Sequence, residues 1–188
     1  MKPLKRILCL LLSVLMLTAL CACSEKESGE VEIPDGFEMA ENENTDYYFF
    51  YPSGWMLDRN DAGLTSVYVS DKDFSNVSIT AFTASAEYPS LMDYVEKYYF
   101  KQFEGNFNNL KIEKNQDGSL KKSVLKIDSC DAIAVNYHAT FSDGDYSFRA
   151  WFVSKGGYIY SILYTAKADL FESHFDEAAA IAENIKFK

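Results

Sequence analysis

The chain has 188 residues, 48% of them hydrophobic and 15% aromatic, with 28 acidic against 18 basic side chains and a formal net charge of −10. An acidic protein repels phosphate backbones, so this balance excludes nucleic acid as an expected partner. The length suits one domain with a full hydrophobic core, to which tyrosine and phenylalanine would contribute much of the volume.

The first residues have the pattern of an export signal. Three basic residues precede the apolar run Ile7–Leu20, and the small residue Ala22 stands directly before Cys23. This order of charge, apolar run and small residue is typical of a cleaved leader, and Leu20-Cys21-Ala22-Cys23 resembles a bacterial lipoprotein processing site. We therefore expect residues 1–22 to be a lipoprotein signal peptide and Cys23 to be the lipidated residue.

Two alternatives to lipidation remain open. One is an uncleaved anchor, although the apolar run of 14 residues is shorter than the ~20 that a spanning helix needs. The other is ordinary secretory cleavage without lipid. Lipid on Cys23 would place the protein outside the cytoplasm, on the outer face of the bacterial cell membrane.

The segment after the leader predicts a tether followed by a single domain. Residues 23–35 are rich in Glu, Ser and Gly, as expected of a flexible acidic linker, and residues 36–188 form the expected domain. Without the three basic residues of the leader, the chain keeps 15 basic and 28 acidic residues, a formal net charge of −13. Such a domain is not attracted to anionic lipid, so attachment would depend on Cys23.

The domain is expected to alternate short strands with two helices. Expected strands cover residues 37–40, 47–51, 55–58, 65–70, 76–83, 130–141, 146–154, 158–166 and 185–188. The segment 110–127 alternates only weakly around Asp117-Gly118, which predicts a polar hairpin near a sheet edge.

Capping patterns predict where both helices begin. Ser90 with Asp93 three residues later forms a capping box, and apolar residues at helical spacing continue until Gly105. Asp169 with Glu172 predicts the second start in the same way. On that second helix, the residues expected to face the sheet are Phe171, Phe175, Ala178 and Ala182.

An Asp143-Gly144 pair predicts a two-residue hairpin turn and therefore a register. This register places His138 opposite Arg149 and Asn136 opposite Trp151, on a polar face. The opposite face is the expected core, formed by Val135, Tyr137, Ala139, Phe141, Tyr146, Phe148, Ala150 and Phe152.

The next turn, Lys155-Gly156-Gly157, is expected to contain three residues. That length places Tyr160, Ile162 and Tyr164 on the core face and Ser161 beside Trp151 on the polar face. A two-residue turn would reverse these positions.

The polar face provides the candidate partner or ligand surface: Asn136, His138, Arg149 and Trp151. Arg and Trp often dominate binding energy, which favours a shallow recognition surface. Alternatively, the face is merely solvated, or it is covered by a helix with Arg149 stacked on an aromatic ring. Contact with Arg149 would lower the pKa of His138, which argues against a proton-shuttling role.

No motif for catalysis, metal or cofactor is found. The chain lacks a Gly-x-Ser-x-Gly elbow, a phosphate loop and a His-Glu-x-x-His motif. A run starting at Asp71 begins like a calcium loop but lacks its sixth-position glycine and its glutamate at the twelfth position. Cys130 is expected to be a buried small hydrophobe, and His174 a packing residue on the second helix, beside its apolar stripe. We expect no catalytic residue, metal or cofactor.

Sequence segments and element order resemble the PsbP-like fold, including its non-photosynthetic bacterial lipoprotein members. The segments are Tyr51-Pro52-Ser53-Gly54-Trp55, Gly157-Tyr158-Ile159-Tyr160-Ser161-Ile162, Tyr164-Thr165-Ala166 and Ile185-Lys186-Phe187. The resemblance covers Phe37 to Lys188 and implies an α+β fold, with an antiparallel sheet between helices in an α/β/α sandwich. Members of this family act mainly as accessory or binding proteins, and the photosynthetic ones bind a photosystem. No binding residue of the family can be carried over.

Together these observations predict a lipid-anchored, extracytoplasmic accessory or binding protein without catalytic activity, whose partner is a protein of the envelope. One alternative is a carrier that holds a small ligand in a tyrosine-lined cleft between sheet and helix. Another is a hydrolase with an unrecognised site. Nucleic acid is not an expected partner of any of them.

Overall fold

The computed structural model describes residues 31–40, 43–58, 65–103, 105 and 107–188, and its compact unit spans Ile33–Lys188. The expected signal peptide, Cys23 and most of the expected tether lie outside the described residues. Within the described part of the chain, no helix is long and apolar enough to cross a membrane.

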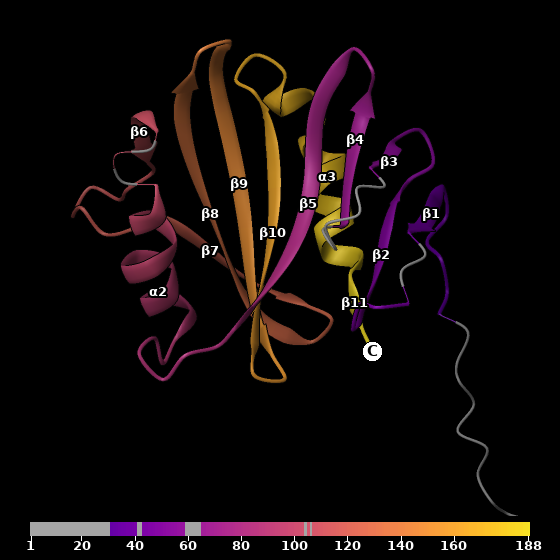
Figure 1. Ribbon diagram of the computed structural model, residues 1–188, viewed down its shortest axis with the longest axis horizontal. Coiled ribbons are helices and arrows are strands. Elements are labelled where there is room, and N and C mark those ends of the chain that lie inside the picture. Colours follow the sequence, from indigo (N-terminus) through magenta and orange to yellow (C-terminus); the bar gives the residue numbers. More distant parts are fainter. Residues whose placement is uncertain (1–30, 41–42, 59–64, 104, 106) are drawn as a thin grey trace, which may run out of the picture. The chain divides into compact units, whose positions relative to one another are not determined.

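An antiparallel sheet of eight strands forms the centre of the unit (Figure 1). Its order is β3-β4-β5-β10-β9-β8-β6, and β7 pairs with β8 beside β6. The strands are β3 Met56–Asp58, β4 Thr65–Ser70, β5 Asp73–Thr83, β6 Asn108–Ile112, β7 Lys122–Ile127, β8 Cys130–Phe141, β9 Gly144–Lys155 and β10 Tyr158–Lys167. A smaller sheet of order β1-β2-β11 comprises Phe37–Ala40, Tyr47–Pro52 and Lys186–Phe187.

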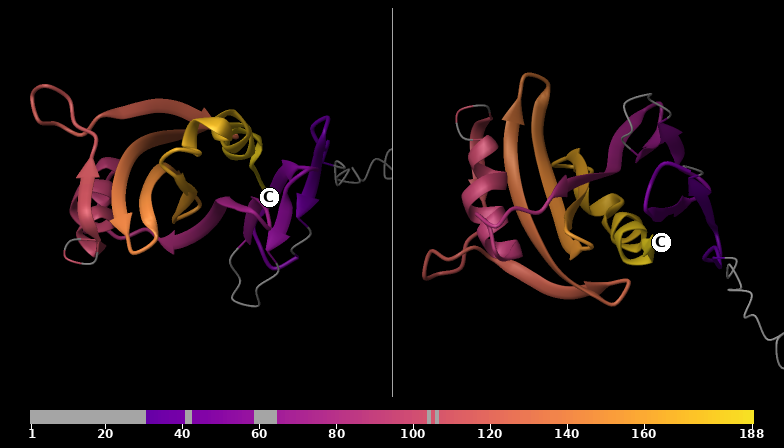
Figure 2. Two further views of the ribbon diagram at one scale, coloured as in Figure 1. Left: turned by 90° about the horizontal axis from the view of Figure 1, so that it is seen from above. Right: turned by 60° about the horizontal axis from the view of Figure 1, so that its bottom comes forward.

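Helices cover both faces of the large sheet, on opposite sides of β8, β9 and β10 (Figure 2). One face carries the helix α2 Leu91–Tyr94, which continues as the π-helix Val95–Tyr99 and the 3₁₀ turn Phe100–Gln102. The other carries the 3₁₀ turn Phe171–Ser173 and the helix α3 Phe175–Asn184. The expected α+β architecture, an antiparallel sheet between helices, is therefore confirmed.

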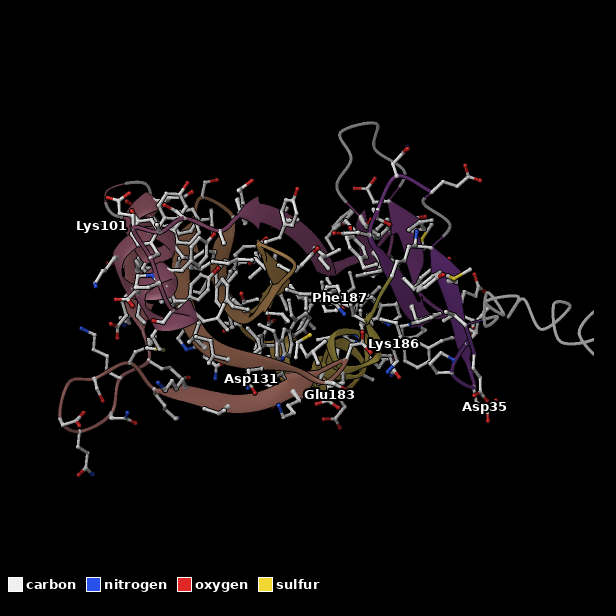
Figure 3. The ribbon with its side chains drawn as sticks, turned by 90° about the horizontal axis from the view of Figure 1, so that it is seen from below. Asp35, Lys101, Asp131, Glu183, Lys186 and Phe187 are labelled. Atoms are coloured by element: carbon white, nitrogen blue, oxygen red, sulfur yellow. The ribbon has the colours of Figure 1, made fainter. Side chains whose placement is uncertain are left out.

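Each face of the sheet has its own hydrophobic core. Ile133, Val135 and Phe152 pack with the α2 segment, whereas Ala132, Ala134 and Trp151 pack with α3 and the smaller sheet. Because side chains alternate along a strand, these two sets follow from the sequence of β8 and β9. Figure 3, viewed from below, shows the side chains that fill the space between the sheet and the helices.

The register of β8 against β9 differs by two residues from the predicted one. Strand β9 begins at Gly144, opposite Phe141, so the turn is Ser142-Asp143. Gly144 adopts a φ of 139°, at which a side chain would be strained. Because glycine has no side chain, β9 can begin directly at this residue. A shift by two residues keeps every side chain on its face, so the predicted core face is correct although its pairs are not.

The turn between β9 and β10 is one residue shorter than predicted. Tyr158 lies opposite Lys155, so only Gly156 and Gly157 form the turn, with φ values of 60° and 83°. Positive φ at both positions matches the right-handed twist of a hairpin. As a result Tyr160, Ile162 and Tyr164 share the face of Trp151, and Ser161 shares the opposite one.

One of the two predicted helix starts is correct. The Ser90 hydroxyl accepts a hydrogen bond from the Asp93 N–H at 3.1 Å and donates one to the Asp93 carboxylate at 2.6 Å. The predicted box at Asp169 is wrong, because α3 starts only after His174, whose side chain makes no capping bond. The 3₁₀ turn that precedes it is held by Tyr164, which donates its hydroxyl proton to the Phe171 carbonyl at 2.9 Å.

The polar hairpin of residues 110–127 is present only near its tip. A single bridge joins Lys114 to Leu120 around Asp117-Gly118, within the described residues. Beyond it the two arms separate, because β6 pairs with one end of β8 and β7 with the other. The edge of β8 therefore offers each arm more backbone partners than the other arm would.

Replacing Gly157 with alanine tests the two-residue turn. At a φ of 83° an added Cβ is strained, so Gly157→Ala should lower the free energy of unfolding by about 1–2 kcal/mol. Gly54→Ala is the matched control, since Gly54 has no positive φ in this range and an added Cβ meets no atom within 4 Å. Urea unfolding measures both. Equal stability of the two variants would contradict this turn geometry.

Candidate functional site

Trp151 does not belong to an exposed recognition surface. Only 2% of the residue is exposed, and it packs in the core beneath α3. The guanidinium carbon of Arg149 lies 5.6 Å from the centroid of its ring. At Trp151 and Arg149 the structure therefore matches the alternative of a covered face with the arginine stacked on an aromatic ring.

Arg149 uses its two terminal nitrogens inside the protein, whereas its buried Nε has no partner among the described residues. Its guanidinium donates to the Asn136 side-chain oxygen at 3.0 Å and to the Ser123 hydroxyl at 3.1 Å. Burial lowers the pKa of Arg149, and the charge of Glu113 opposes that shift. Arg149 therefore ties β7, β8 and β9 together, and truncating it would damage the sheet before it affected any partner.

His138 remains accessible, and its neighbours differ from those predicted. The predicted pairing with Arg149 is wrong, because Ser147 stands opposite His138 and its hydroxyl lies 2.9 Å from the imidazole Nδ1. On the other side of the ring, Nε2 lies 3.6 Å from a Glu113 carboxylate oxygen. The side chain of His138 is 47% exposed. Each ring nitrogen therefore has a neighbour, while about half of the side chain stays open to solvent.

Glu113 connects the site to the tip of the β6–β7 segment. Its carboxylate lies 3.1 Å from the Lys121 ammonium. Burial alone would raise the pKa of Glu113, but the hydrogen bond and charge of Lys121, together with hydrogen bonds from Asn136 and His138, outweigh it and hold that pKa below its ordinary value. Glu113 is therefore a charged carboxylate at neutral pH, placed beside an imidazole.

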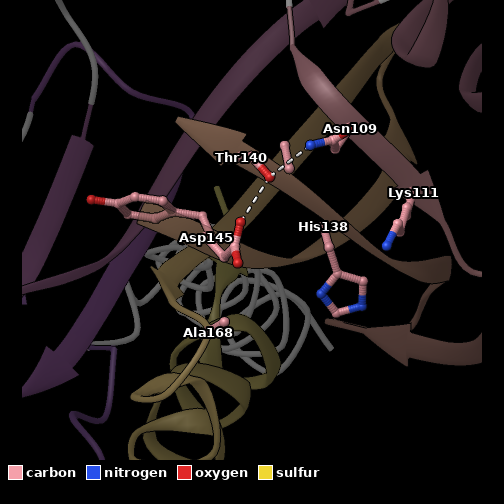
Figure 4. Close-up of a pocket in the computed structure, with 8 residues that line it drawn as sticks. Asn109, Lys111, His138, Thr140, Asp145 and Ala168 are labelled. Carbon is pink, nitrogen blue, oxygen red and sulfur yellow. Dashed lines mark hydrogen bonds between the residues drawn. The ribbon is translucent and has the colours of Figure 1, made fainter. Parts of the chain in front are cut away.

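A groove of about 620 Å³ surrounds the exposed side of His138 (Figure 4). We call it the His138 groove; its lining residues are Asn109, Lys111, His138, Ala139, Thr140, Asp145, Tyr146 and Ala168. Thr140 donates to the Asp145 carboxylate at 2.7 Å, while Lys111 and His138 lie side by side across the groove from it. Opposite charges therefore line its two sides, as in a site for polar contacts.

Sequence reasoning misses Asn109, Lys111 and Glu113. Asn109 and Lys111 belong to β6, and Glu113 follows it. The register of β6 against β8 shifts between Asn108 and Lys111, where Asn109 has a φ of 51°. Such an irregularity erases the alternation from which a strand is recognised. The available signal was only the polar character of the segment.

The Ser147, His138 and Glu113 side chains do not have the geometry of a catalytic triad. In that arrangement the serine contacts Nε2 and the acid Nδ1, the reverse of the contacts here. Ser147 is only 4% exposed and is not among the residues that line the groove. A buried hydroxyl cannot reach a substrate, so Ser147 orients the imidazole rather than attacking.

A second cavity, of about 460 Å³, lies between the end of β5 and α2. We call it the tyrosine cleft; its lining residues are Ala81, Phe82, Thr83, Ser85, Glu87, Tyr88, Tyr94 and Tyr98. It has the position and lining that the ligand-carrier alternative requires.

The remaining candidates pack within the structure. His174 lies between carboxylates, with Nε2 3.2 Å from Asp73 and Nδ1 2.9 Å from Glu177, and it meets the Trp55 ring edge-on. Cys130 is partly buried against the core. In the part of the chain that the structure describes, no group of three or more His, Cys, Asp or Glu could hold a metal ion.

Known proteins share this fold. The profile of the family described as PsbP-like protein matches residues 20–187. No curated protein is significantly similar to the sequence. Cyanobacterial PsbP (CyanoP) from Synechocystis has a TM-score of 0.57 and 12% identity, over 85% of this chain and 96% of its own.

Two further structures are similar. A Bacteroides thetaiotaomicron protein has a TM-score of 0.56 and 15% identity over 81% of this chain, which spans about half (49%) of its length. A Pseudomonas aeruginosa protein of unknown function has a TM-score of 0.51 and 11% identity, over 81% of this chain and 97% of its own. At such low identity these structures establish the fold and leave the site to be argued from its own residues.

The pKa of Glu113 makes stability depend on pH. Because this pKa lies below the ordinary 4.5, the carboxylate stabilises the fold above about pH 4.5, and the contribution disappears as pH falls through the lower value. Glu113→Gln should therefore lose less stability on acidification than the parent chain, as measured by urea unfolding at several pH values. Exposed Glu32→Gln is the control. Parallel curves for the parent and Glu113→Gln would contradict this account.

Proposed function

The chain belongs to the PsbP-like family, and from this premise we propose that it is an extracytoplasmic accessory protein, anchored by lipid, which binds a partner without catalysing a reaction. The His138 groove is the proposed contact site. The observation that carries this proposal is the imidazole of His138, oriented by the buried Ser147 and exposed in a groove of opposite charges.

The groove suits a protein surface better than a reacting substrate. Lys111 and Asn109 carry hydrogen-bond donors, and Asp145 carries an acceptor that is itself positioned by Thr140. Side chains fixed in this way keep their geometry when a partner arrives, which reduces the entropy cost of binding. A hydrolytic function finds less support, because the hydroxyl next to His138 is buried.

Lipid on Cys23 would supply the membrane attachment. The export-type leader precedes this residue, and residues 23–35 would form a tether that gives the acidic domain reach. One acyl chain binds a bilayer only marginally, so stable anchoring needs the several chains of a bacterial lipoprotein. The partner would then be a protein of the same envelope.

Recovery of a cross-linked partner tests the groove. Lys111→Ala and His138→Ala should each reduce recovery from envelopes about tenfold, since truncating a central contact costs roughly 1–2 kcal/mol. Lys122→Ala is the matched control, an exposed lysine on β7 that does not line the groove. Thermal unfolding checks that each variant folds. Undiminished recovery with both groove variants would refute the contact site.

Replacing Cys23 tests the anchor. Cys23→Ser should abolish acylation, so the chain should accumulate unprocessed or leave the membrane fraction. Cys21→Ser removes a neighbouring thiol and should leave processing unchanged. Fractionation with a radiolabelled fatty acid and mass spectrometry of the N-terminus gives the readout. A processed Cys23→Ser chain that stayed in the membrane fraction would overturn the assignment.

A further inference from the structure

Among the residues that the structure describes, strand β5 has an open edge at its C-terminal end. Strand β4 pairs with β5 only as far as Ile79, which stands opposite Thr65, whereas β10 pairs with it up to Thr83. Among the described residues, no strand lies along the outer side of residues 80–83. Figure 1 shows this end of β5 running on past β4 towards α2. An open edge offers backbone donors and acceptors to another chain.

The outward groups belong to Ala81 and Thr83. The Ala84 N–H donates to the Gly157 carbonyl at 2.8 Å, so the backbone groups of Ala84 face β10. In an extended strand, successive residues direct these groups to alternate sides. Ala81 and Thr83 therefore direct theirs away from β10. Both residues are exposed, and both line the tyrosine cleft.

Tyr94, one of the residues that line the tyrosine cleft, has a buried hydroxyl without a partner among the described residues. Tyr94 is 3% exposed, and its hydroxyl makes no hydrogen bond with any described residue. An unsatisfied buried hydroxyl is costly, and burial raises its pKa, so it keeps its proton for donation. The rings of Tyr88 and Tyr98 lie 6.4 Å and 5.3 Å from that of Tyr94. A ligand carbonyl that enters beside the hydroxyl end of Tyr94, once the neighbouring side chains move aside, would receive the missing hydrogen bond.

Charge at the cleft favours a cation. Glu87 lines it, and the faces of tyrosine rings attract ammonium and guanidinium groups. The nearby Lys97 is already engaged by Asp93 in an ion pair on the helix. The net negative charge of the chain also repels an acidic ligand at longer range.

We propose that the open edge of β5 and the tyrosine cleft bind an extended segment of a partner protein by strand addition, with a lysine or arginine of that segment over the tyrosine rings. The segment's backbone pairs with Ala81 and Thr83, and one of its carbonyls accepts from Tyr94. A small molecule in the cleft would leave the outward backbone groups unused. A second copy of this chain would bring its own net negative charge to the same place.

Designed peptides provide the probe. Nonapeptides of alternating threonine and valine, with a central Lys, Arg, Glu or Ala, are titrated into the purified full chain and followed by fluorescence polarisation. Lys and Arg peptides should bind roughly tenfold more tightly than the Glu peptide, and backbone N-methylation should abolish binding. Amide exchange should slow at Ala81 and Thr83. Absence of binding by every peptide would overturn the proposal.

Two variants locate the site. Ala81→Pro removes only an outward N–H and leaves the pairing with β10 intact, as proline does on edge strands. Tyr94→Phe removes the unpartnered hydroxyl, with Tyr68→Phe on β4 as its matched control. Each should weaken Lys-peptide binding about tenfold, while the control binds normally. If circular dichroism shows that Ala81→Pro does not fold, the affinity of Tyr94→Phe for the Lys peptide still tests the site.

Three outcomes contradict the proposal. Unchanged affinity in Tyr94→Phe would exclude the cleft, and equal binding of N-methylated peptides would indicate a small-ligand pocket. Dimerisation in sedimentation experiments, lost in Ala81→Pro, would identify a second copy as the occupant. His138→Ala should bind peptide normally, so failure here and failure of the His138 groove are distinguishable.

Discussion

Strands β8, β9 and β10 carry apolar side chains on both faces, so this sheet is stable only when each face is covered. The α2 segment covers Ile133 and Phe152, and α3 with the smaller sheet covers Ala134 and Trp151. Burial of apolar area on both sides is the main stabilising contribution. Both candidate sites lie at strand ends or sheet edges, where the covering elements stop.

Much of this architecture could be predicted because the strands are strongly patterned. The bounds of β4 and β8 follow directly from their sequences, and the Ser90 cap from a local rule. Register was harder, because it depends on which residues of a turn tolerate positive φ. From the sequence, Gly144 could have been a turn residue or the first residue of β9, and the turn at Gly156-Gly157 could have contained two or three residues. Such choices are decided by the twist and packing of the completed sheet, which local sequence does not contain.

The candidate site was predictable only in part. His138 was correctly placed on the polar side of β8, but its neighbours come from segments distant in sequence. Trp151 shares that side and is nevertheless buried, because α3 covers one part of the face and leaves another open. Glu113 could not be found from periodicity, since β6 is irregular. Alternation assigns a face to each residue, whereas tertiary packing decides whether that face meets solvent.

The pairing of β11 with β2 has a consequence for the order of folding. Lys186 stands opposite Tyr48, and the Lys188 N–H donates to the Asp46 carbonyl at 2.8 Å. One edge of β2 therefore stays unpaired until residues 186–188 have been synthesised and have reached it. Contacts so distant in sequence slow folding. If the chain is exported as proposed, late completion of the smaller sheet would help to keep it open for passage through a translocation channel.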